Sequence, residues 1–387
     1  MLPRSADVIV IGGGVIGASV AYYLSKKKIG VLLLERSDFA SGTSGACDGM
    51  IFMQSKKPGL HLALALKSRR IFEDLPEKLG SDIELRRNGG MIIFRSDLEL
   101  KAMAPFMEEQ KRGNLGVSLL DLHQARELEP CLGPNIAAAT FCPLDAQVNP
   151  LCLTYAFLKA AKRHGAKLFA RTPVTGFHVK GNRIYAVVTP QNVVATRSVV
   201  NAAGVFASQV GDLLSLTIPV APRRGQLLVT EVLPPILTRC LLSARYIAAK
   251  YDPALAEGQN PGFSIEQTGN GNFLLGSTRE FVGFDKRTTR DAIRTILMEV
   301  TPILPRLKEA HLIRTFAGLR PYTPDGLPIL GKVSTPEGFI MAAGHEGDGI
   351  ALSPITGQLI AELIADGKTS ISLEPFSLER FIPKEPS

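Results

Sequence analysis

Cysteine is scarce in this 387-residue sequence, and its five cysteines form no C-x-x-C pair. An odd number of unclustered thiols argues against a disulfide framework and against a structural zinc or iron–sulfur site. We therefore expect no metal centre and a reducing, cytoplasmic compartment. The five thiols belong to Cys47, Cys131, Cys142, Cys152 and Cys240.

Long apolar runs and basic arms are also absent. No run approaches the roughly 20 apolar residues of a membrane-spanning helix, so we expect a protein that is at most peripheral at a membrane. The chain enters its first predicted strand at once, which leaves no room for a signal peptide. The net charge of +8 is dispersed along the chain. Without an aromatic-rich basic stretch, nucleic acid is not expected, whereas an anionic substrate or an acidic partner surface stays open.

A glycine-rich turn follows the first apolar run. Val8 to Ile11 is unbroken by polar residues, which suits a strand buried on both faces of a parallel sheet. Gly12, Gly14 and Gly17 follow in G-x-G-x-x-G register. In this motif the glycines allow a tight turn, a close approach of the backbone to a pyrophosphate, and packing of the next helix against the strand.

The elements after the turn complete a dinucleotide-binding unit. A helix is predicted from Val15 to Lys27, and its free N-terminal N–H groups favour phosphate. An apolar strand follows from Val31 to Leu34, and Glu35 ends it 18 residues past Gly17. This spacing suits a carboxylate on the ribose hydroxyls, and an acid here disfavours a 2′-phosphate.

The character of the chain changes after the middle. Helix and strand signals alternate from Pro150 to Leu214, whereas strand-like runs between Gly, Pro and Asn turns fill 218–289, and a helix is predicted from Arg290 to Leu304. The chain is also longer than one typical core. The predicted fold is α/β, with a second domain built on an antiparallel sheet.

Three later motifs join the N-terminal fingerprint. They are VNAAG at 200–204, AGLRP at 317–321 with Asp325, and a strand followed by GHEGDGI at 344–350 and a helix. Together they resemble the D-amino-acid oxidase superfamily of FAD-dependent amine oxidoreductases. The glycine oxidase, sarcosine oxidase and proline or opine dehydrogenase β-subunit branch is the most similar.

The resemblance implies a discontinuous, Rossmann-type FAD-binding domain and an antiparallel-sheet substrate domain. It also implies non-covalent FAD, because the cysteine that attaches the flavin in sarcosine oxidases has no counterpart at 320–323. Residues 41–49 would run along the pyrophosphate and flavin. The implied domain boundaries are 1–85, 140–217 and 315–387 for the FAD-binding domain, and 86–139 and 218–314 for the substrate domain.

Three residues are candidates for the chemistry. The resemblance implies that Arg320 holds the substrate carboxylate, and a planar guanidinium suits this task. Tyr246, in a predicted strand at 245–249, would add a hydroxyl near the carboxylate or pack in a core. His345 would hydrogen-bond the flavin or cap the last helix. Gly347 stands where glycine oxidases have a second arginine, which argues against glycine and for a bulkier substrate.

Most of the remaining candidates are cofactor contacts. His61 and His123 have no spacing that suggests metal binding or acid–base work. The cofactor-binding residues that the fingerprint and the resemblance indicate are Gly12, Gly14, Val15, Ile16, Gly17, Glu35, Arg36, Thr43, Ser44, Gly45, Val174, Ala203, Gly204, Gly318, Gly347, Gly349 and Ile350.

The function expected from the resemblance is FAD-dependent oxidation of an amino or imino acid to its imine. The electrons would pass to O2 or to a partner subunit, and a homo-oligomer is also open. The alternative is a 2-hydroxy-acid or glycerol-3-phosphate dehydrogenase, against which stands the lack of a recognisable cluster of basic residues for phosphate.

Overall fold

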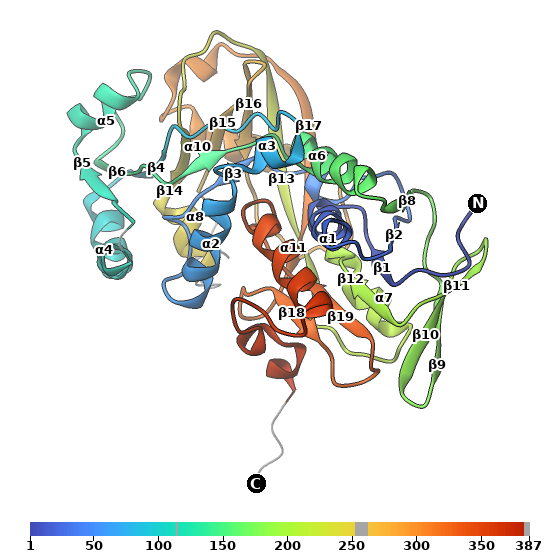
Figure 1. The fold of residues 1–387 in the computed structure, drawn as a ribbon. Coiled ribbons are helices and arrows are strands. Elements are labelled where there is room, and N and C mark those ends of the chain that lie inside the picture. Colours follow the sequence, from blue (N-terminus) through green and yellow to red (C-terminus); the bar gives the residue numbers. More distant parts are fainter. Residues whose placement is uncertain (114, 252–261, 383–387) are drawn as a thin grey trace.

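Two large β-sheets organise the protein. The computed structural model describes residues 1–113, 115–251 and 262–382. In Figure 1 the strands of the first sheet lie to the right of and below α11 (Gly349–Ala365), and those of the second lie above it and extend to the upper left. No helix in these ranges combines the length and the apolar character needed to cross a bilayer.

The first sheet has six strands in the order β18-β19-β12-β1-β2-β8. All neighbours are parallel except the pair β18 and β19. The central strand is β1, as its apolar run predicts. The strands are β1 (Val8–Ile11), β2 (Val31–Leu34), β8 (Lys167–Phe169), β12 (Ser198–Asn201), β18 (Ile329–Lys332) and β19 (Phe339–Ala343).

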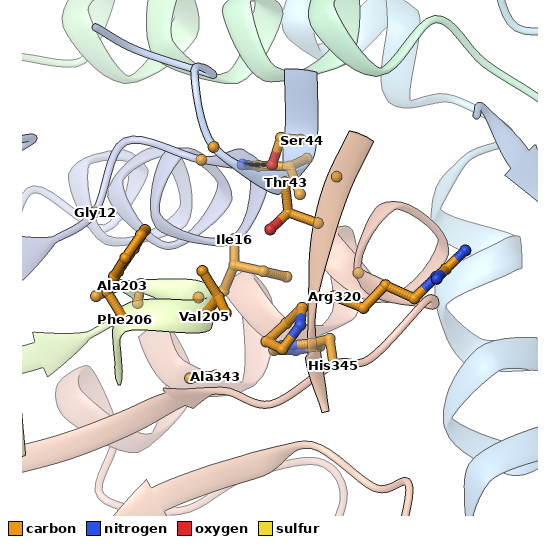
Figure 2. Close-up of a pocket in the computed structure, with 18 of the residues that line it drawn as sticks. Gly12, Ile16, Thr43, Ser44, Ala203, Val205, Phe206, Arg320, Ala343 and His345 are labelled. Atoms are coloured by element: carbon orange, nitrogen blue, oxygen red, sulfur yellow. Dashed lines mark hydrogen bonds between the residues drawn. The ribbon is translucent and has the colours of Figure 1, made fainter. Parts of the chain in front are cut away.

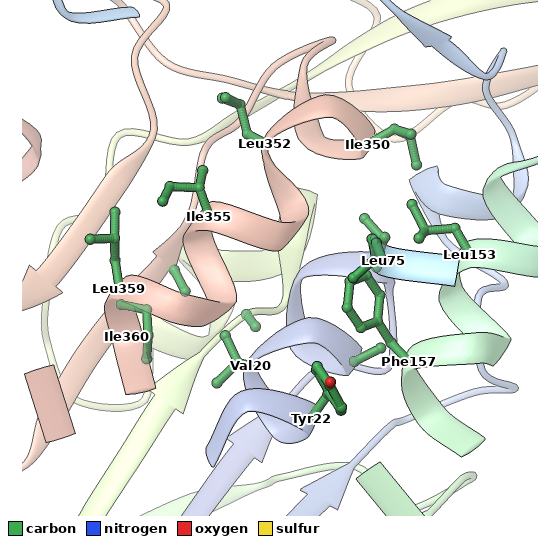
Figure 3. Packing of buried hydrophobic residues seen from close by; sticks show 14 of the residues in the cluster. Val20, Tyr22, Leu75, Leu153, Phe157, Ile350, Leu352, Ile355, Leu359 and Ile360 are labelled. Carbon is green, nitrogen blue, oxygen red and sulfur yellow. The ribbon is translucent and has the colours of Figure 1, made fainter. Parts of the chain in front are cut away.

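Alternate side chains of β1 enter two different cores. Val8 and Val10 pack with α1 (Val15–Lys26), α6 (Pro150–Arg163) and α11. Figure 3 shows Val20 and Tyr22 of α1 packed between Phe157 of α6 and the apolar residues of α11. Ile9 and Ile11 instead face a core shared with the small sheet β9–β11. Burial on both faces explains why this strand has no polar residue.

Several short strands and one helix lie beside the first sheet. Gly181 and Asn182 join β9 to β10, and both have positive φ, as a two-residue hairpin turn requires. The short antiparallel sheet β3–β7 lies beside the cavity described below. These strands and helices are β9 (Gly176–Lys180), β10 (Arg183–Val188), β11 (Val193–Ala195), α7 (Ala207–Asp212), β3 (Met50–Ile51) and β7 (Ala146–Gln147).

The second sheet has eight strands in the order β17-β13-β16-β15-β14-β4-β6-β5. Every neighbouring pair is antiparallel except β14 with β4, which is parallel. Its strands are β4 (Gly90–Phe94), β5 (Ser118–Leu120), β6 (Ala138–Cys142), β13 (Ala221–Val232), β14 (Cys240–Ser243), β15 (Ser264–Gln267), β16 (Asn272–Gly276) and β17 (Leu312–Tyr322).

Helices cover the second sheet on both faces. The predicted covering helix is α10, and its Ile296 and Val300 pack on Leu228 and Leu275 of the sheet. Asp121 begins α5 with a capping box, which stabilises a helix start. The helices around this sheet and along the first are α2 (Leu60–Ile71), α3 (Leu75–Leu79), α4 (Asp97–Arg112), α5 (Leu122–Leu128), α8 (Ala244–Tyr251) and α10 (Arg290–Val300).

The predicted strand at 245–249 is wrong, because this segment belongs to α8. Ser243 ends β14, and its side-chain oxygen accepts a hydrogen bond from the Tyr246 N–H at 3.1 Å. The same oxygen accepts one from the Phe263 N–H at 2.9 Å. A serine that bonds the third N–H of a helix is an N-cap, and it stabilises a helix start here in spite of the strand propensity of Tyr246 and Ile247.

Two strands extend across the domain boundaries expected from the sequence. β6 begins at Ala138 and β17 continues to Tyr322, and both belong to the second sheet. β17 continues because its residues up to Tyr322 pair with β13. The division into domains stays a prediction.

Candidate active site

A cavity of about 490 Å³ connects the first sheet with the second. Its walls include the β1–α1 turn, residues 41–50, the face of β13 and β17, and the turn before α11. Figure 2 shows Gly12 and Ala203 at one end and Arg320 at the other. The elongated site therefore joins a dinucleotide fingerprint to the predicted carboxylate clamp.

The glycines at the first end allow close backbone packing. Gly12 has φ +110°, and a Cβ there would lie 2.4 Å from the Ala202 oxygen. A Cβ on Gly17 would lie 1.9 Å from the Gly12 oxygen. Both positions therefore need glycine, and Gly17 supports the turn without lining the cavity. The start of α1 presents Val15 and Ile16 to the same space.

Glu35 is held in place at the end of β2. Its carboxylate accepts hydrogen bonds from the Gly13 N–H at 2.7 Å and from the Ser37 N–H at 2.8 Å. The guanidinium carbon of neighbouring Arg36 lies 3.4 Å from the centre of the Phe206 ring. Both Glu35 and Arg36 line the cavity, at the end where the sequence predicts that a carboxylate binds the ribose hydroxyls.

Thr43 and Ser44 belong to the loop of residues 41–49, which we call the cofactor loop. They connect this loop to the start of α1 and to the second sheet. The Ser44 oxygen accepts a hydrogen bond from the Val15 N–H at 3.0 Å, at the start of α1. The Thr43 hydroxyl donates to the Leu319 carbonyl on β17 at 2.6 Å. This loop therefore runs from the fingerprint to the second sheet along the cavity, as expected for residues 41–49.

Two paired glycines leave the second sheet without side chains at the point where the cofactor loop crosses it. Gly225 of β13 is paired with Gly318 of β17. A Cβ on Gly318 would lie 2.1 Å from the Ala46 oxygen, and one on Gly225 would lie 2.4 Å from Nη1 of Arg320. The missing side chains let the loop and the Arg320 guanidinium lie directly on the strands.

Arg320 is fixed by three hydrogen bonds. Nη1 donates to the Thr278 carbonyl at 3.0 Å, and Nη2 donates to the Ser277 hydroxyl at 2.7 Å and the Tyr246 hydroxyl at 3.4 Å. Burial opposes its charge, but Tyr246, Glu346 and Asp48 raise the pKa of the guanidinium above its usual value. Arg320 is therefore a permanent, immobilised cation in the cavity wall.

Two further arginines lie behind this wall. The side chains of Arg223 and Arg279 are buried, and each forms an ion pair with the buried carboxylate of Glu346, at 3.2 Å for Arg279. Glu346 itself lines the cavity and has φ +48° in the turn before α11. The sequence showed no cluster of basic residues, because these arginines lie far apart along the chain.

Tyr246 lies between the arginines. The guanidinium carbon of Arg279 is 4.2 Å from its ring centre. Burial opposes ionisation of Tyr246, but Arg279 and Arg320 outweigh it and lower the pKa of the phenol below its usual value. The Tyr246 hydroxyl faces Arg320, as expected if this residue adds a hydroxyl near the substrate carboxylate. The residue lies on a helix and not on the predicted strand.

The turn before α11 is held by buried polar contacts. Nε2 of His345 lies 3.0 Å from the Thr356 hydroxyl on α11, and burial lowers the pKa of His345 to about 3. His345 is therefore neutral and is not the helix cap, since Asp348 occupies that position. Asp348 pairs with Lys56 at 2.8 Å and with His61 at 3.1 Å, so His61 supports this turn.

Most predicted site residues line this one cavity, and Gly17 and Gly45 do not. His123 is exposed and does not line the cavity, and its Nδ1 lies 3.5 Å from Oε1 of Glu127. No group of three potential metal ligands occurs among the described residues. Lining residues that sequence reasoning did not single out include Asp48, Met50, Thr172, Phe206, Lys286 and Glu346.

The missed residues carried little local signal. Asp48 lies in the segment expected along the flavin, so an acid inside that apolar and small-residue stretch could have been noticed. Phe206 and Lys286 could not, because only the folded chain brings their segments to the cavity.

The site fits FAD. Glu35 at the end of β2, the glycine turn at the start of α1 and the bare glycine face of β13–β17 together provide a long groove for an extended dinucleotide. A Rossmann-type sheet joined through such a groove to an arginine-lined antiparallel sheet defines an FAD-dependent oxidoreductase.

Comparison with known proteins agrees. Residues 7–363 match the family model DAO, described as FAD dependent oxidoreductase, and the chain belongs to this family. It is 32% identical to the hydrogen cyanide synthase subunit HcnC of Pseudomonas aeruginosa, over 98% of this chain and 97% of that protein. It is 31% identical to glycine oxidase of Geobacillus kaustophilus, over 98% of both chains.

The structural comparison gives the same class. L-proline dehydrogenase from P. horikoshii superposes with a TM-score of 0.89 at 27% identity, covering 98% of both chains. The predicted fold class, a parallel FAD-binding sheet with a largely antiparallel second sheet, is confirmed. The expected cofactor FAD and the expected family of amino-acid oxidases and dehydrogenases are confirmed as well.

Proposed function

We propose that this protein oxidises an α-amino or imino acid to its imine, and that Arg320 binds the substrate carboxylate. FAD, when bound, supplies the two-electron acceptor for this oxidation. The observation that carries the assignment is the fixed guanidinium of Arg320 in the cavity wall. Three of its five N–H donors are used by Thr278, Ser277 and Tyr246, which leaves two for a carboxylate.

Gly347 supports a substrate larger than glycine. Its missing side chain leaves free space beside Arg320, since a Cβ there would lie 3.7 Å from Cδ and Nε of Arg320. No arginine fills this space as the resemblance to glycine oxidases would require. A side chain or an N-substituent on the substrate can therefore occupy it.

The electron acceptor is O2 or a partner protein. The relative HcnC is named as a subunit, which supports a partner for this chain as well. The peroxide yield of the isolated protein separates the two. Slow reaction with O2 combined with fast dye reduction supports a partner, and stoichiometric peroxide at the full rate contradicts it.

The function is tested by anaerobic bleaching of the flavin absorbance. The panel contains proline, sarcosine, glycine, D-alanine, lactate and glycerol 3-phosphate. We expect bleaching by amino or imino acids, and faster bleaching by proline or sarcosine than by glycine. Reduction by lactate or glycerol 3-phosphate alone would contradict the proposal and support the alternative class.

A further inference from the structure

The cavity contains a carboxyl group that the proposed carboxylate clamp does not use. Asp48 lies on the cofactor loop and lines the cavity together with Arg320 and Tyr246. The loop is fixed on both sides of it. Before Asp48, the Ala46 oxygen lies against Gly318 of β17, and after it the Gly49 N–H donates to Glu266 of β15 at 2.8 Å.

These contacts hold Asp48 beside the end of β17 that carries Arg320. Burial raises the pKa of the Asp48 carboxyl, whereas Arg320, the Met50 N–H and Lys56 lower it. The titratable groups around it are Arg320, Lys56, Glu266, Tyr246, Cys47 and Cys240.

We propose that Asp48 forms an amine subsite: its carboxylate binds the ammonium group of an amino acid whose carboxylate is held by Arg320, and accepts one proton from it. This inference rests on the proposed function. The two opposite charges in one cavity match a zwitterion, and they select against hydroxy acids, which carry no positive group to pair with Asp48.

The proton transfer prepares the substrate for oxidation. One N–H bond of the ammonium breaks, an O–H bond forms on Asp48, and the electron pair stays on nitrogen. The neutral amine can then stabilise the positive charge that develops as a hydride leaves the adjacent carbon. A positioned general base contributes roughly 10²–10⁴-fold to such a step.

The variant Asp48→Asn tests the subsite through the pH profile. We use the FAD-loaded enzyme and whichever of proline, sarcosine and D-alanine the wild type oxidises. In the wild type, kcat/KM should fall at acidic pH as Asp48 becomes protonated. In Asp48→Asn the acidic limb set by Asp48 should be replaced by one set by the substrate amine: kcat/KM at pH 7 should drop about 100-fold and should rise about tenfold per pH unit up to the pKa of that amine.

Glu266 provides the matched control. Its carboxyl is buried next to the same loop, and burial followed by the charge of Asp48 raises its pKa to about 8. Glu266 does not line the cavity. Glu266→Gln should therefore keep the acidic limb. If the limb moves to the pKa of the substrate amine in Glu266→Gln and keeps its wild-type position in Asp48→Asn, the proton acceptor is not Asp48 and the proposal is overturned.

Binding of acetate separates this inference from the proposed function. Acetate has a carboxylate and no amine, and its binding is followed by the flavin absorbance. Arg320→Ala should weaken it more than tenfold, and Asp48→Asn should leave it equal or tighter. Weaker acetate binding in Asp48→Asn contradicts the amine subsite and leaves the role of Arg320 standing.

Discussion

Arg320 is the residue on which the substrate assignment depends. Its guanidinium is already oriented by Thr278, Ser277 and Tyr246, so its remaining donors lose little conformational freedom on binding. Proline at 321 removes a backbone donor and restricts the conformation of Arg320 as well. The side chain is thus a rigid anion receptor rather than a surface cation.

Truncation of Arg320 should abolish most of the catalytic efficiency. Charge-assisted hydrogen bonds from its two remaining donors are together worth about 2–4 kcal/mol, so kcat/KM of Arg320→Ala should fall at least about thirtyfold. Arg320→Lys should recover only part of it, because a flexible ammonium lacks the fixed N–H directions of the guanidinium. Steady-state kinetics and the FAD content are measured together. Near wild-type efficiency, or loss of FAD from the alanine variant, would contradict the assignment.

At the scale of elements, the site depends on the contact between the cofactor loop and β17. Gly318 permits this contact, and the Thr43 hydroxyl bonds the Leu319 carbonyl beside it. Asn149 in turn caps α6 through the N–H groups of Leu151 and Cys152. Local caps fix the helices, but the loop is placed by two sheets at once.

Gly318→Ala should damage this contact. The added Cβ would lie 2.1 Å from the Ala46 oxygen, so backbone has to move on one side, and we expect at least about a tenfold loss in FAD affinity and a lower Tm. Gly176→Ala on β9 is the matched control, because a Cβ there makes only ordinary contacts at 3.7 Å and beyond. FAD titration and thermal unfolding are compared. Equal FAD affinity in the two variants would refute the role of Gly318.

At the scale of the whole molecule, the cofactor cavity lies between the two large sheets. Bound FAD should therefore couple the stability of the parts of the protein on either side of it. Acid precipitation should release FAD into the supernatant, because the chain has no cysteine at 320–323 for covalent attachment. The apo-protein should unfold at a lower temperature and recover on addition of FAD. A ligand at 100 times its Kd stabilises by about 2.7 kcal/mol. Flavin that stays with the precipitated protein would show covalent attachment.

Buried carboxyl groups should make folding pH-dependent. Glu266 has its pKa raised to about 8 by burial and by Asp48, so the folded state holds its proton more tightly than the unfolded state. Its stabilisation is therefore present below the unfolded pKa of about 4.3 and is lost as pH rises towards 8. Chemical unfolding of Glu266→Gln should show a smaller loss of stability between pH 5 and 8, by on the order of 2 kcal/mol. An unchanged pH dependence would exclude Glu266 as its source.

Local sequence determined the FAD half of this protein. The order of Val8–Ile11, the glycines, α1, β2 and Glu35 is sufficient because each step is a contact between near neighbours in the chain. Most helices and strands agree for the same reason. The exception is the segment of Tyr246, where the side chain of Ser243 decided between strand and helix.

Only the tertiary structure decided how the substrate end is built. The charged cluster at this end is formed by residues from separate strands and loops, namely Arg223, Arg279, Arg320 and Glu346. No spacing in the sequence predicts that these residues lie close together. Asp48 acquires its environment from β15 and β17, more than 200 residues away in the chain. Burial and the charges of distant residues set the ionisation of such groups, so the sequence determined the cofactor and the folded chain determined the cavity that receives the substrate.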